Sequence, residues 1–140
     1  MWILSFLLIK GGDIGHRLRL AMTAWNYGGG PSLPAYSNLT EVITVAPGEN
    51  VSPPTLSGNA VVGQTLTADV GQWIGTAPIV YTIEWQRCFA TFDFCVSTNV
   101  TGPSYTITAQ DAGIRVKAVV RAMNSWGTTY AGVMSPVITA

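Results

Sequence analysis

Apolar and polar residues alternate along the most regular segments of this chain. In residues 80–88, one face carries Tyr81, Ile83, Trp85 and Arg87. In residues 114–124, one face carries Val116, Ala118, Val120 and Ala122, and the other carries Arg115, Lys117 and Arg121. A period of two with charge on one side is typical of a strand that is half-buried in an antiparallel sheet. These segments are therefore predicted to be β-strands.

Shorter strands are expected between turn signals. Pro53, Pro54 and Gly58 punctuate an opening edge strand, where proline is tolerated. Gly71 and residues 75–78 mark turns. The remaining predicted strands cover residues 60–69, 96–100, 104–108 and 129–139. Because no window shows a sustained period of 3.6, we predict an all-β antiparallel sandwich.

The chain contains an internal similarity. Placing Asp13 over Asp111 aligns residues 13–37 with 111–135 without a gap, and the apolar face of the second segment is matched in the first by Leu18, Leu20, Met22 and Ala24. The offset of about 100 residues is the length of one β-sandwich domain. We predict a partial domain over residues 1–46, consisting of the last three strands of one copy, and a complete domain over 47–140. Residues 46–50 are the expected linker.

Half a sandwich cannot cover its inner face alone, and its edge strands carry unpaired N–H and C=O groups. Residues 1–46 are therefore expected to be completed by another chain, to pack on the second domain, or to represent a fragment. Leu7 and Ile9 are candidate interface residues on that face. The apolar residues 1–10 fit a buried strand better than a truncated export signal or an arbitrary start of the reading frame.

Charge and composition narrow the classes of function. Seven Lys and Arg balance seven Asp and Glu, which removes the usual electrostatic argument for nucleic acid or an anionic membrane. The single histidine, His16, has no cluster of cysteines or acids around it in the sequence. We therefore expect no enzymatic activity, no catalytic residues, no cofactor and no metal site. With only 10% charged residues, either small polar residues solvate the surface or other subunits cover much of it.

Two cysteines enclose an aromatic loop. Cys88 and Cys95 end one predicted strand and begin the next, a spacing that suits a disulfide closing a hairpin. Such a bond would place the protein outside a reducing cytosol. The loop holds Phe89, Phe92 and Phe94, which are candidate interface residues because hairpin tips are normally polar. The alternative is that one or two rings fold back over the core.

A series of short motifs resembles the bacterial and phage Ig-like repeat. In chain order they lie at residues 58–67, 71–73, 84–88, 104–108, 111–113 and 122–124. The family pattern runs G-x-x-x-V-G-x-x-L, G-x-W, W-x-R-C, Y-x-x-x-x-x-D-x-G and A-x-N-x-x-G. The resemblance covers residues 49–140, and residues 13–45 match the last third of the pattern. It implies an Ig-like sandwich that serves as a scaffolding or adhesive part and shares no catalytic residues.

Four residues have structural interpretations within these motifs. Trp85 is expected in the core rather than stacked on a ligand. Tyr105 is expected to pack its ring and bond its hydroxyl near the turn formed by Asp111 and Gly113, and Asp111 to accept backbone N–H bonds there. In the first copy, Phe6 or Leu7 takes the place of the tyrosine.

Two hypotheses of function follow. The first is a structural or assembly protein of a phage-like virion (tail, fibre or capsid decoration) or of an extracellular filament. It would contact other copies of itself or neighbouring structural subunits. The second is an adhesion module of a tail fibre or bacterial surface protein that recognises a glycan or host receptor. Both predict an extracellular location, with no nucleic acid partner and no membrane insertion.

Overall fold

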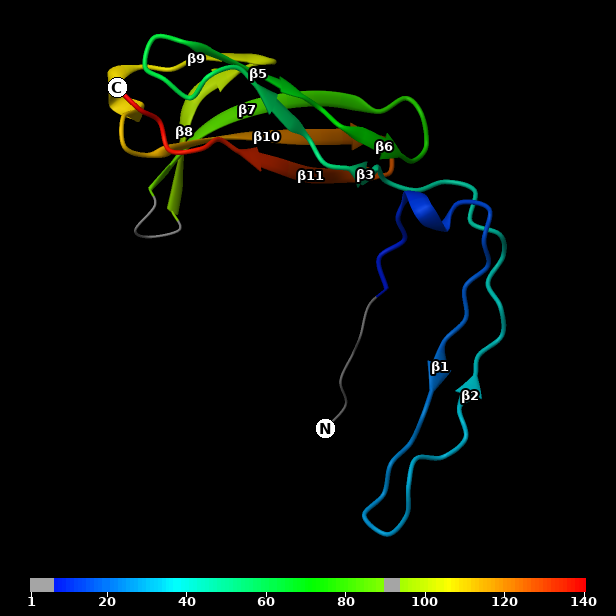
Figure 1. Cartoon of the computed structure of the whole chain (residues 1–140). Coiled ribbons are helices and arrows are strands. Elements are labelled where there is room, and N and C mark those ends of the chain that lie inside the picture. The colour runs from blue at the N-terminus through cyan, green and yellow to red at the C-terminus, as the bar shows by residue number, and fades with distance from the viewer. Residues whose placement is uncertain (1–6, 90–93) are drawn as a thin grey trace.

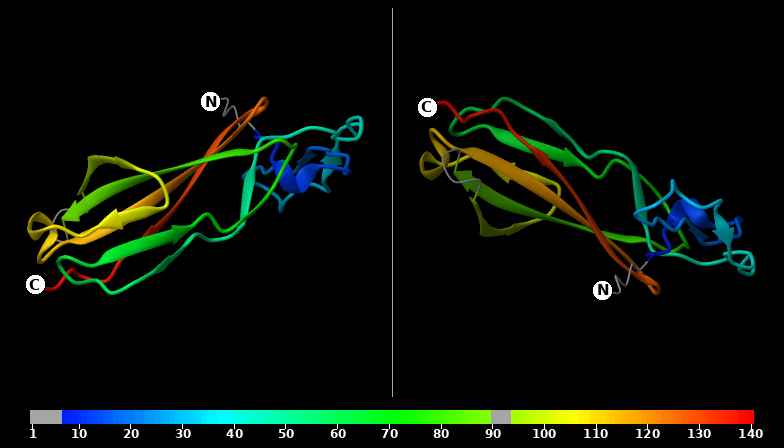
Figure 2. Two further views of the ribbon diagram at one scale, coloured as in Figure 1. Left: turned by 90° about the horizontal axis from the view of Figure 1, so that it is seen from above. Right: turned by 90° about the horizontal axis from the view of Figure 1, so that it is seen from below.

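The computed structural model describes residues 7–89 and 94–140 and consists almost entirely of antiparallel strands. Residues 46–140 form a two-layer β-sandwich, and residues 7–45 form an extended hairpin, here called the arm, which projects from one end of the sandwich (Figure 1). The arm runs across the long axis of the sandwich, so it is foreshortened in the views from above and below (Figure 2). The predicted all-β sandwich is confirmed.

The first layer is a four-stranded sheet with the order β11-β10-β7-β8. Its members are β7 (Val80–Phe89), β8 (Phe94–Thr101), β10 (Arg115–Asn124) and β11 (Gly127–Met134). The central strand, β10, pairs with β7 from Arg115↔Cys88 to Met123↔Val80. On its other side it pairs with β11 from Lys117↔Met134 to Asn124↔Gly127.

The second layer combines two smaller sheets. One has the order β4-β5-β9 and the other pairs β3 with β6. The strands are β3 (Glu49–Ser52), β4 (Thr55–Ser57), β5 (Thr65–Asp69), β6 (Gln72–Ile74) and β9 (Ser104–Thr106). A short 3-10 helix, η2 (Ala109–Asp111), joins β9 to β10.

The core lies between the two layers and is centred on Trp85. This side chain is fully buried, its ring stacks on that of Tyr105 with 5.3 Å between centroids, and its Nε1 donates to the carbonyl of Gly102 at 2.9 Å. The rest of the cluster comes from both layers: Leu66, Ala68, Ile83, Ile107, Val116, Ala118, Val120 and Ile138. The alternation along β10 thus places Val116, Ala118 and Val120 in this core, and that along β7 places Ile83 and Trp85 there.

The arm contains little regular structure. It begins with the 3-10 helix η1 (Gly11–Asp13), and its two sides pair over β1 (Ala21–Met22) and β2 (Ala35–Tyr36). The hairpin turns between Asn26 and Gly29, which form an isolated antiparallel bridge. Residues 1–6, including Phe6 and most of the predicted first strand, lie outside the described residues.

Several predicted boundaries differ from the structure. The strand predicted over 129–139 is β11, which ends at Met134. Residues 46–50 are not a free linker, because Ala46 is buried against the sandwich and β3 begins at Glu49. The strand predicted over 60–69 is confined to Thr65–Asp69. Its expected first half turns at Gly63, which has a φ of 86°, and Val62 donates to the carbonyl of Thr139 instead. The Val62 N–H is therefore bonded to the C-terminal segment of the chain and not to a neighbouring strand of the β4-β5-β9 sheet.

Candidate interaction surface

The arm is fixed to the sandwich through η1. Glu49, at the start of β3, forms an ion pair with Lys10 Nζ at 3.0 Å. Its side chain also accepts a hydrogen bond from the Gly12 N–H at 2.7 Å. The Gly12 N–H and Lys10 together hold the pKa of Glu49 below its ordinary value. Gly11 is buried, and a Cβ there would overlap the carbonyl of Ile74. The joint therefore requires a glycine at this position and a carboxylate opposite it.

The corner at η1 repeats the backbone of the corner at η2. The Asp13 side chain accepts from the Lys10 N–H at 3.0 Å, and the Asp111 side chain accepts from the Thr108 N–H at 2.7 Å. After each corner a glycine donates its N–H across the hairpin, Gly15 to Ile43 at 2.7 Å and Gly113 to Ile138 at 2.9 Å. The φ angles of these glycines are 84° and 80°, in the region that favours glycine.

The two hairpins also share a hydrogen bond from a backbone N–H to a serine or threonine hydroxyl. In the sandwich, the Val116 N–H donates to Ser135 Oγ at 2.9 Å, and in the arm the Leu18 N–H donates to Thr40 Oγ1 at 3.0 Å. These partners are 19 residues apart in the sandwich and 22 apart in the arm. The predicted ungapped match of Ser37 with Ser135 is therefore wrong, because the returning side of the arm carries extra residues and Thr40 takes the place of Ser135.

The extra residues interrupt the ladder of the arm. Ser37 and Ser32 act like Thr40, since their hydroxyls accept the N–H groups of Leu20 and Ala24 from the opposite side at 2.9 and 3.0 Å. Side-chain hydroxyls thus replace backbone carbonyls where the returning side bulges. Because these bonds run to side-chain hydroxyls and not to backbone carbonyls, the regular backbone ladder is interrupted, and β1 and β2 are short.

Equivalent positions in the two hairpins differ in burial. In β10, the inward-facing residues Val116, Ala118, Val120 and Ala122 have no exposed surface. In the arm, Leu20 is 63% exposed and Met22 is 62% exposed, and Ala24 is also exposed. The same alternating pattern that builds the core of the sandwich is therefore left open to solvent along the arm.

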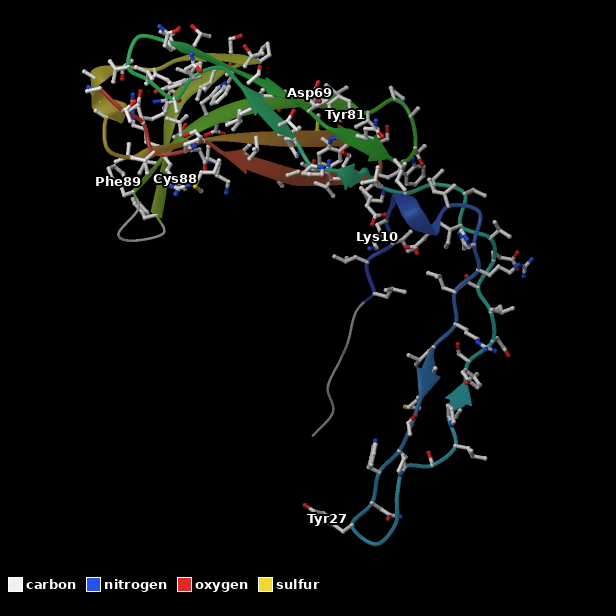
Figure 3. The ribbon with its side chains drawn as sticks, in the orientation of Figure 1. Lys10, Tyr27, Asp69, Tyr81, Cys88 and Phe89 are labelled. Atoms are coloured by element: carbon white, nitrogen blue, oxygen red, sulfur yellow. A yellow bond between two sulfur atoms is a disulfide. The ribbon has the colours of Figure 1, made fainter. Side chains whose placement is uncertain are left out.

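The arm carries further exposed apolar residues. Leu7, Ile9, Leu18 and Leu20, with Arg19, Ser37 and Thr40, line a shallow hollow of about 380 Å³. Towards the tip of the arm the exposed apolar residues are Trp25, Tyr27, Leu33, Tyr36 and Leu39. Tyr27 lies at the very end of the hairpin (Figure 3). Tyr36 lies opposite Ala21 and therefore belongs to the other face of the arm, where Arg19 lies over its ring at 4.1 Å. The hollow at Leu18 and Leu20 is an exposed apolar surface of the kind that marks a site of interaction. We call the residues Leu7, Ile9, Leu18, Leu20 and Met22 the arm face.

The sandwich holds a buried charged cluster behind its core. Asp111 is fully buried and pairs with Arg87 Nε at 2.6 Å. The Tyr105 hydroxyl donates to Asp111 Oδ2 at 2.9 Å, and Thr108 donates to the same oxygen through its N–H and its hydroxyl. Burial alone would raise the pKa of Asp111, but these hydrogen bonds outweigh it and the pKa is lowered. Asp111 is thus a structural carboxylate with every oxygen engaged.

Asp111→Asn should destabilise the sandwich by about 3 kcal/mol at pH 7, because Arg87, whose side chain is only 21% exposed, is left without its counter-charge. A carboxylate with a lowered pKa stabilises the fold above its unfolded pKa, near 3.8, and that contribution is lost as the pH falls through the folded value. The difference in unfolding free energy between wild type and variant should therefore shrink in acid. Denaturant unfolding at pH 7 and pH 3 measures it, with Asp69→Asn as the control, and an equal difference at both pH values would contradict this role.

Asp13 is the counterpart of Asp111 in the arm, but its surroundings differ. Its side chain is half-buried and accepts only the Lys10 N–H among the described residues. Leu7 stands three residues before Lys10, as Tyr105 stands three before Thr108, so the arm has no tyrosine hydroxyl at this corner. No arginine of the described residues pairs with Asp13. The acidic corner is present in the arm without its cationic partner.

The disulfide hairpin lies at the end of the sandwich opposite the arm (Figure 3). Cys88 and Cys95 face each other across β7 and β8 and form the predicted disulfide, which is confirmed. Phe89 is 38% exposed and Phe94 is 57% exposed, and the two are cross-strand neighbours. Phe92 falls outside the described residues. The assignment of these rings to an interface stays a prediction.

The native protein should contain no free thiol at Cys88 or Cys95. Replacing both cysteines by serine should lower the unfolding free energy by about 2–3 kcal/mol, because the bond restricts a short loop of the unfolded chain. Intact-mass spectrometry with an alkylating agent, with and without prior reduction, is the check. Alkylation of both cysteines in the unreduced protein would exclude the bond.

Other chemistry is sparse in the part of the chain that the structure describes. No group of three or more His, Cys, Asp or Glu side chains could hold a metal ion there. Among the same residues, no helix is long and apolar enough to cross a membrane. His16 is exposed on the arm, and its ring lies near the carbonyl of Ile14.

The chain was compared with known proteins. No protein-family model, no curated protein and no solved structure matches it.

Proposed function

We propose that this chain is a non-enzymatic structural protein, built from Ig-like repeats, whose arm joins it to neighbouring subunits of an extracellular assembly. The assembly is a phage-like virion, in its tail, fibre or capsid decoration, or an extracellular filament. One observation carries the proposal. The inward-facing positions of β10 are fully buried in the sandwich, whereas the equivalent positions Leu20 and Met22 of the arm are more than half exposed.

The proposal rests on the arm being the last part of a second sandwich copy. The matching bonds at the two corners support this interpretation, as do the equivalent hydroxyls of Thr40 and Ser135. The motif order that resembles the Ig-like repeat supports it as well. A hairpin of this type is stable in a folded protein only when its apolar side is covered. Covering Leu20 and Met22 by a neighbour would contribute about 1.5–3 kcal/mol for each side chain.

The geometry suits strand addition. The N–H groups of Leu18, Leu20 and Ala24 bond across the hairpin to hydroxyl oxygens. Because successive residues of a strand point to opposite sides, the N–H groups of Arg19, Ala21 and Thr23 face the open edge. An open edge beside an apolar face is the arrangement that β-augmentation uses. The joint at Glu49 holds this edge clear of the sandwich.

A second candidate function is an adhesion module that binds a glycan or a host receptor. The exposed rings of Phe89 and Phe94, held beside a disulfide at the end away from the arm, favour it. The disulfide is compatible with an oxidising, extracellular environment in either case.

Negative-stain electron microscopy and light scattering of the purified native protein separate the two candidates. A structural subunit should form regular assemblies of uniform size that persist on dilution. An adhesion module should remain monomeric and bind a soluble glycan or receptor with one site per chain. A monomer that binds nothing on a glycan array and forms no assembly, either alone or with other subunits of the particle, would contradict both.

A further inference from the structure

We propose that the occupant of the arm face is an antiparallel β-strand of a different subunit, and that this strand carries an arginine that pairs with Asp13. The inference rests on the proposed function and specifies the partner. Each feature of the strand follows from the way in which β7 covers β10 in the intact sandwich.

The position of the partner strand follows from the register of β10. Val116 lies opposite Arg87, Ala118 opposite Trp85, and Val120 opposite Ile83. The arm counterparts of these three β10 residues are Leu18, Leu20 and Met22, and no strand among residues 7–89 and 94–140 pairs with their outer edge. A strand added there in the same register places one residue opposite each of them. The edge N–H groups of Arg19 and Ala21 then gain backbone acceptors.

The arginine follows from the acidic corner. In the sandwich, the residue opposite Val116 is Arg87, and its Nε reaches Asp111 at 2.6 Å. In the arm, the residue opposite Leu18 would lie equally close to Asp13. Asp13 accepts one hydrogen bond from Lys10 among the described residues and has acceptor capacity left. Covering the arm face would bury this carboxylate, and a buried carboxylate needs a cationic or donating partner.

A large apolar side chain follows from the space beside Leu20. In the sandwich, the ring of Trp85 stacks on that of Tyr105, and Trp85 is the cross-strand neighbour of Ala118. In the arm, Leu7 takes the place of Tyr105 and Leu20 takes the place of Ala118. The change from tyrosine to leucine removes about as many atoms as the change from alanine to leucine adds, and volume-conserving changes are tolerated best. The partner strand should therefore carry a large apolar residue opposite Leu20, two residues before its arginine.

A second copy of this chain does not supply such a strand. The inward-facing residues of another arm, from Leu18 to Ala24, include no basic side chain. The β7 strand of another copy has the right pattern, but its Trp85 is fully buried and its Arg87 is paired within its own sandwich. A different subunit with an unpaired strand of this pattern meets the requirement, whereas two arms would leave both Asp13 carboxylates without cations.

Register-specific cross-linking of the full chain tests the inference. The probe is a synthetic peptide with the sequence of residues 79–88, in which Cys88 is serine and residue 86 is cysteine. In the sandwich Gln86 lies opposite Lys117, whose counterpart in the arm is Arg19. The Arg19→Cys chain should therefore form a disulfide with this peptide. A peptide with cysteine at residue 82 instead should cross-link to Thr23→Cys, the counterpart of Arg121, and only weakly to Arg19→Cys.

The charge is tested in the same assay. Asp13→Asn in the Arg19→Cys chain should lower the initial cross-linking rate about tenfold, the loss expected for a charge-assisted hydrogen bond. Replacing arginine 87 of the peptide by glutamine should cause the same loss, with no further loss when both changes are combined. Glu41→Gln, which removes an exposed acid of the arm, is the matched control and should leave the rate unchanged.

The outcomes separate this inference from the proposed function. Cross-linking without register preference, or with equal rates for Asp13→Asn and Glu41→Gln, would overturn the arginine strand. The proposed function would survive that result if Leu20→Lys still abolished association of the chain. The proposed function itself would be refuted by the opposite result, namely that changes in the arm face leave association of the chain intact.

Discussion

Trp85→Ala is expected to destabilise the sandwich strongly. Its side chain is fully buried and stacks on Tyr105, and its Nε1 bonds to Gly102. Deleting a buried aromatic costs about 3–5 kcal/mol. Because the unfolding free energy of small domains is about 5–15 kcal/mol, this loss is a large fraction of it.

Urea unfolding followed by circular dichroism measures this effect. Trp126→Ala is the matched control, since that side chain is 54% exposed and its loss should change the unfolding free energy by less than about 1 kcal/mol. If both variants lost equally little, the packing described between the two layers would be wrong.

Leu20→Lys is expected to weaken self-association of the purified chain by about 10- to 100-fold. In the absence of a partner strand, the arm faces of different molecules cover one another, and each buried leucine contributes about 1.5–3 kcal/mol. The change should not affect the stability of the sandwich, because Leu20 is 63% exposed and touches none of its core.

Ala21→Lys is the control for this substitution. It adds the same charge one residue further along, on the opposite side of the strand. Sedimentation velocity over a range of concentrations gives the dissociation constant of each variant. An unchanged constant for Leu20→Lys would exclude the arm face as the contact and leave the hairpin at Phe89 and Phe94 as the remaining candidate.

The regular strands could be predicted because their information is local. In β10 the alternation of apolar and polar residues coincides with burial from Val116 to Ala122, and in β7 it does so around Ile83 and Trp85. Both strands lie close to their predicted bounds. The disulfide could be predicted because Cys88 and Cys95 bracket a single hairpin. In each case neighbours in the chain are also neighbours in space.

Predictions failed where distant segments meet. Asp111 accepts the predicted backbone N–H bond, from Thr108, but its ion pair with Arg87, 24 residues away, was not predicted. A charged residue at an inward-facing position needs a buried partner, and this requirement was the available signal. The alignment of the two copies is wrong beyond the outgoing strand for a similar reason. Bulges on the returning side of the arm shift its register, so that Thr40 and not Ser37 corresponds to Ser135. The shared residues Val-Ile-Thr at 42–44 and 137–139 mark the correct offset.

Hydrogen–deuterium exchange of residues 17–24 tests the central claim most directly, namely that the arm is covered by a neighbouring subunit. In dilute, monomeric protein these amides should exchange far faster than those of residues 115–122, because the arm face is open. In the assembled protein they should become protected to a similar degree as residues 115–122, while the hairpin at Phe89 and Phe94 changes little. Assembly that leaves residues 17–24 exchanging at the monomer's rate would contradict the account.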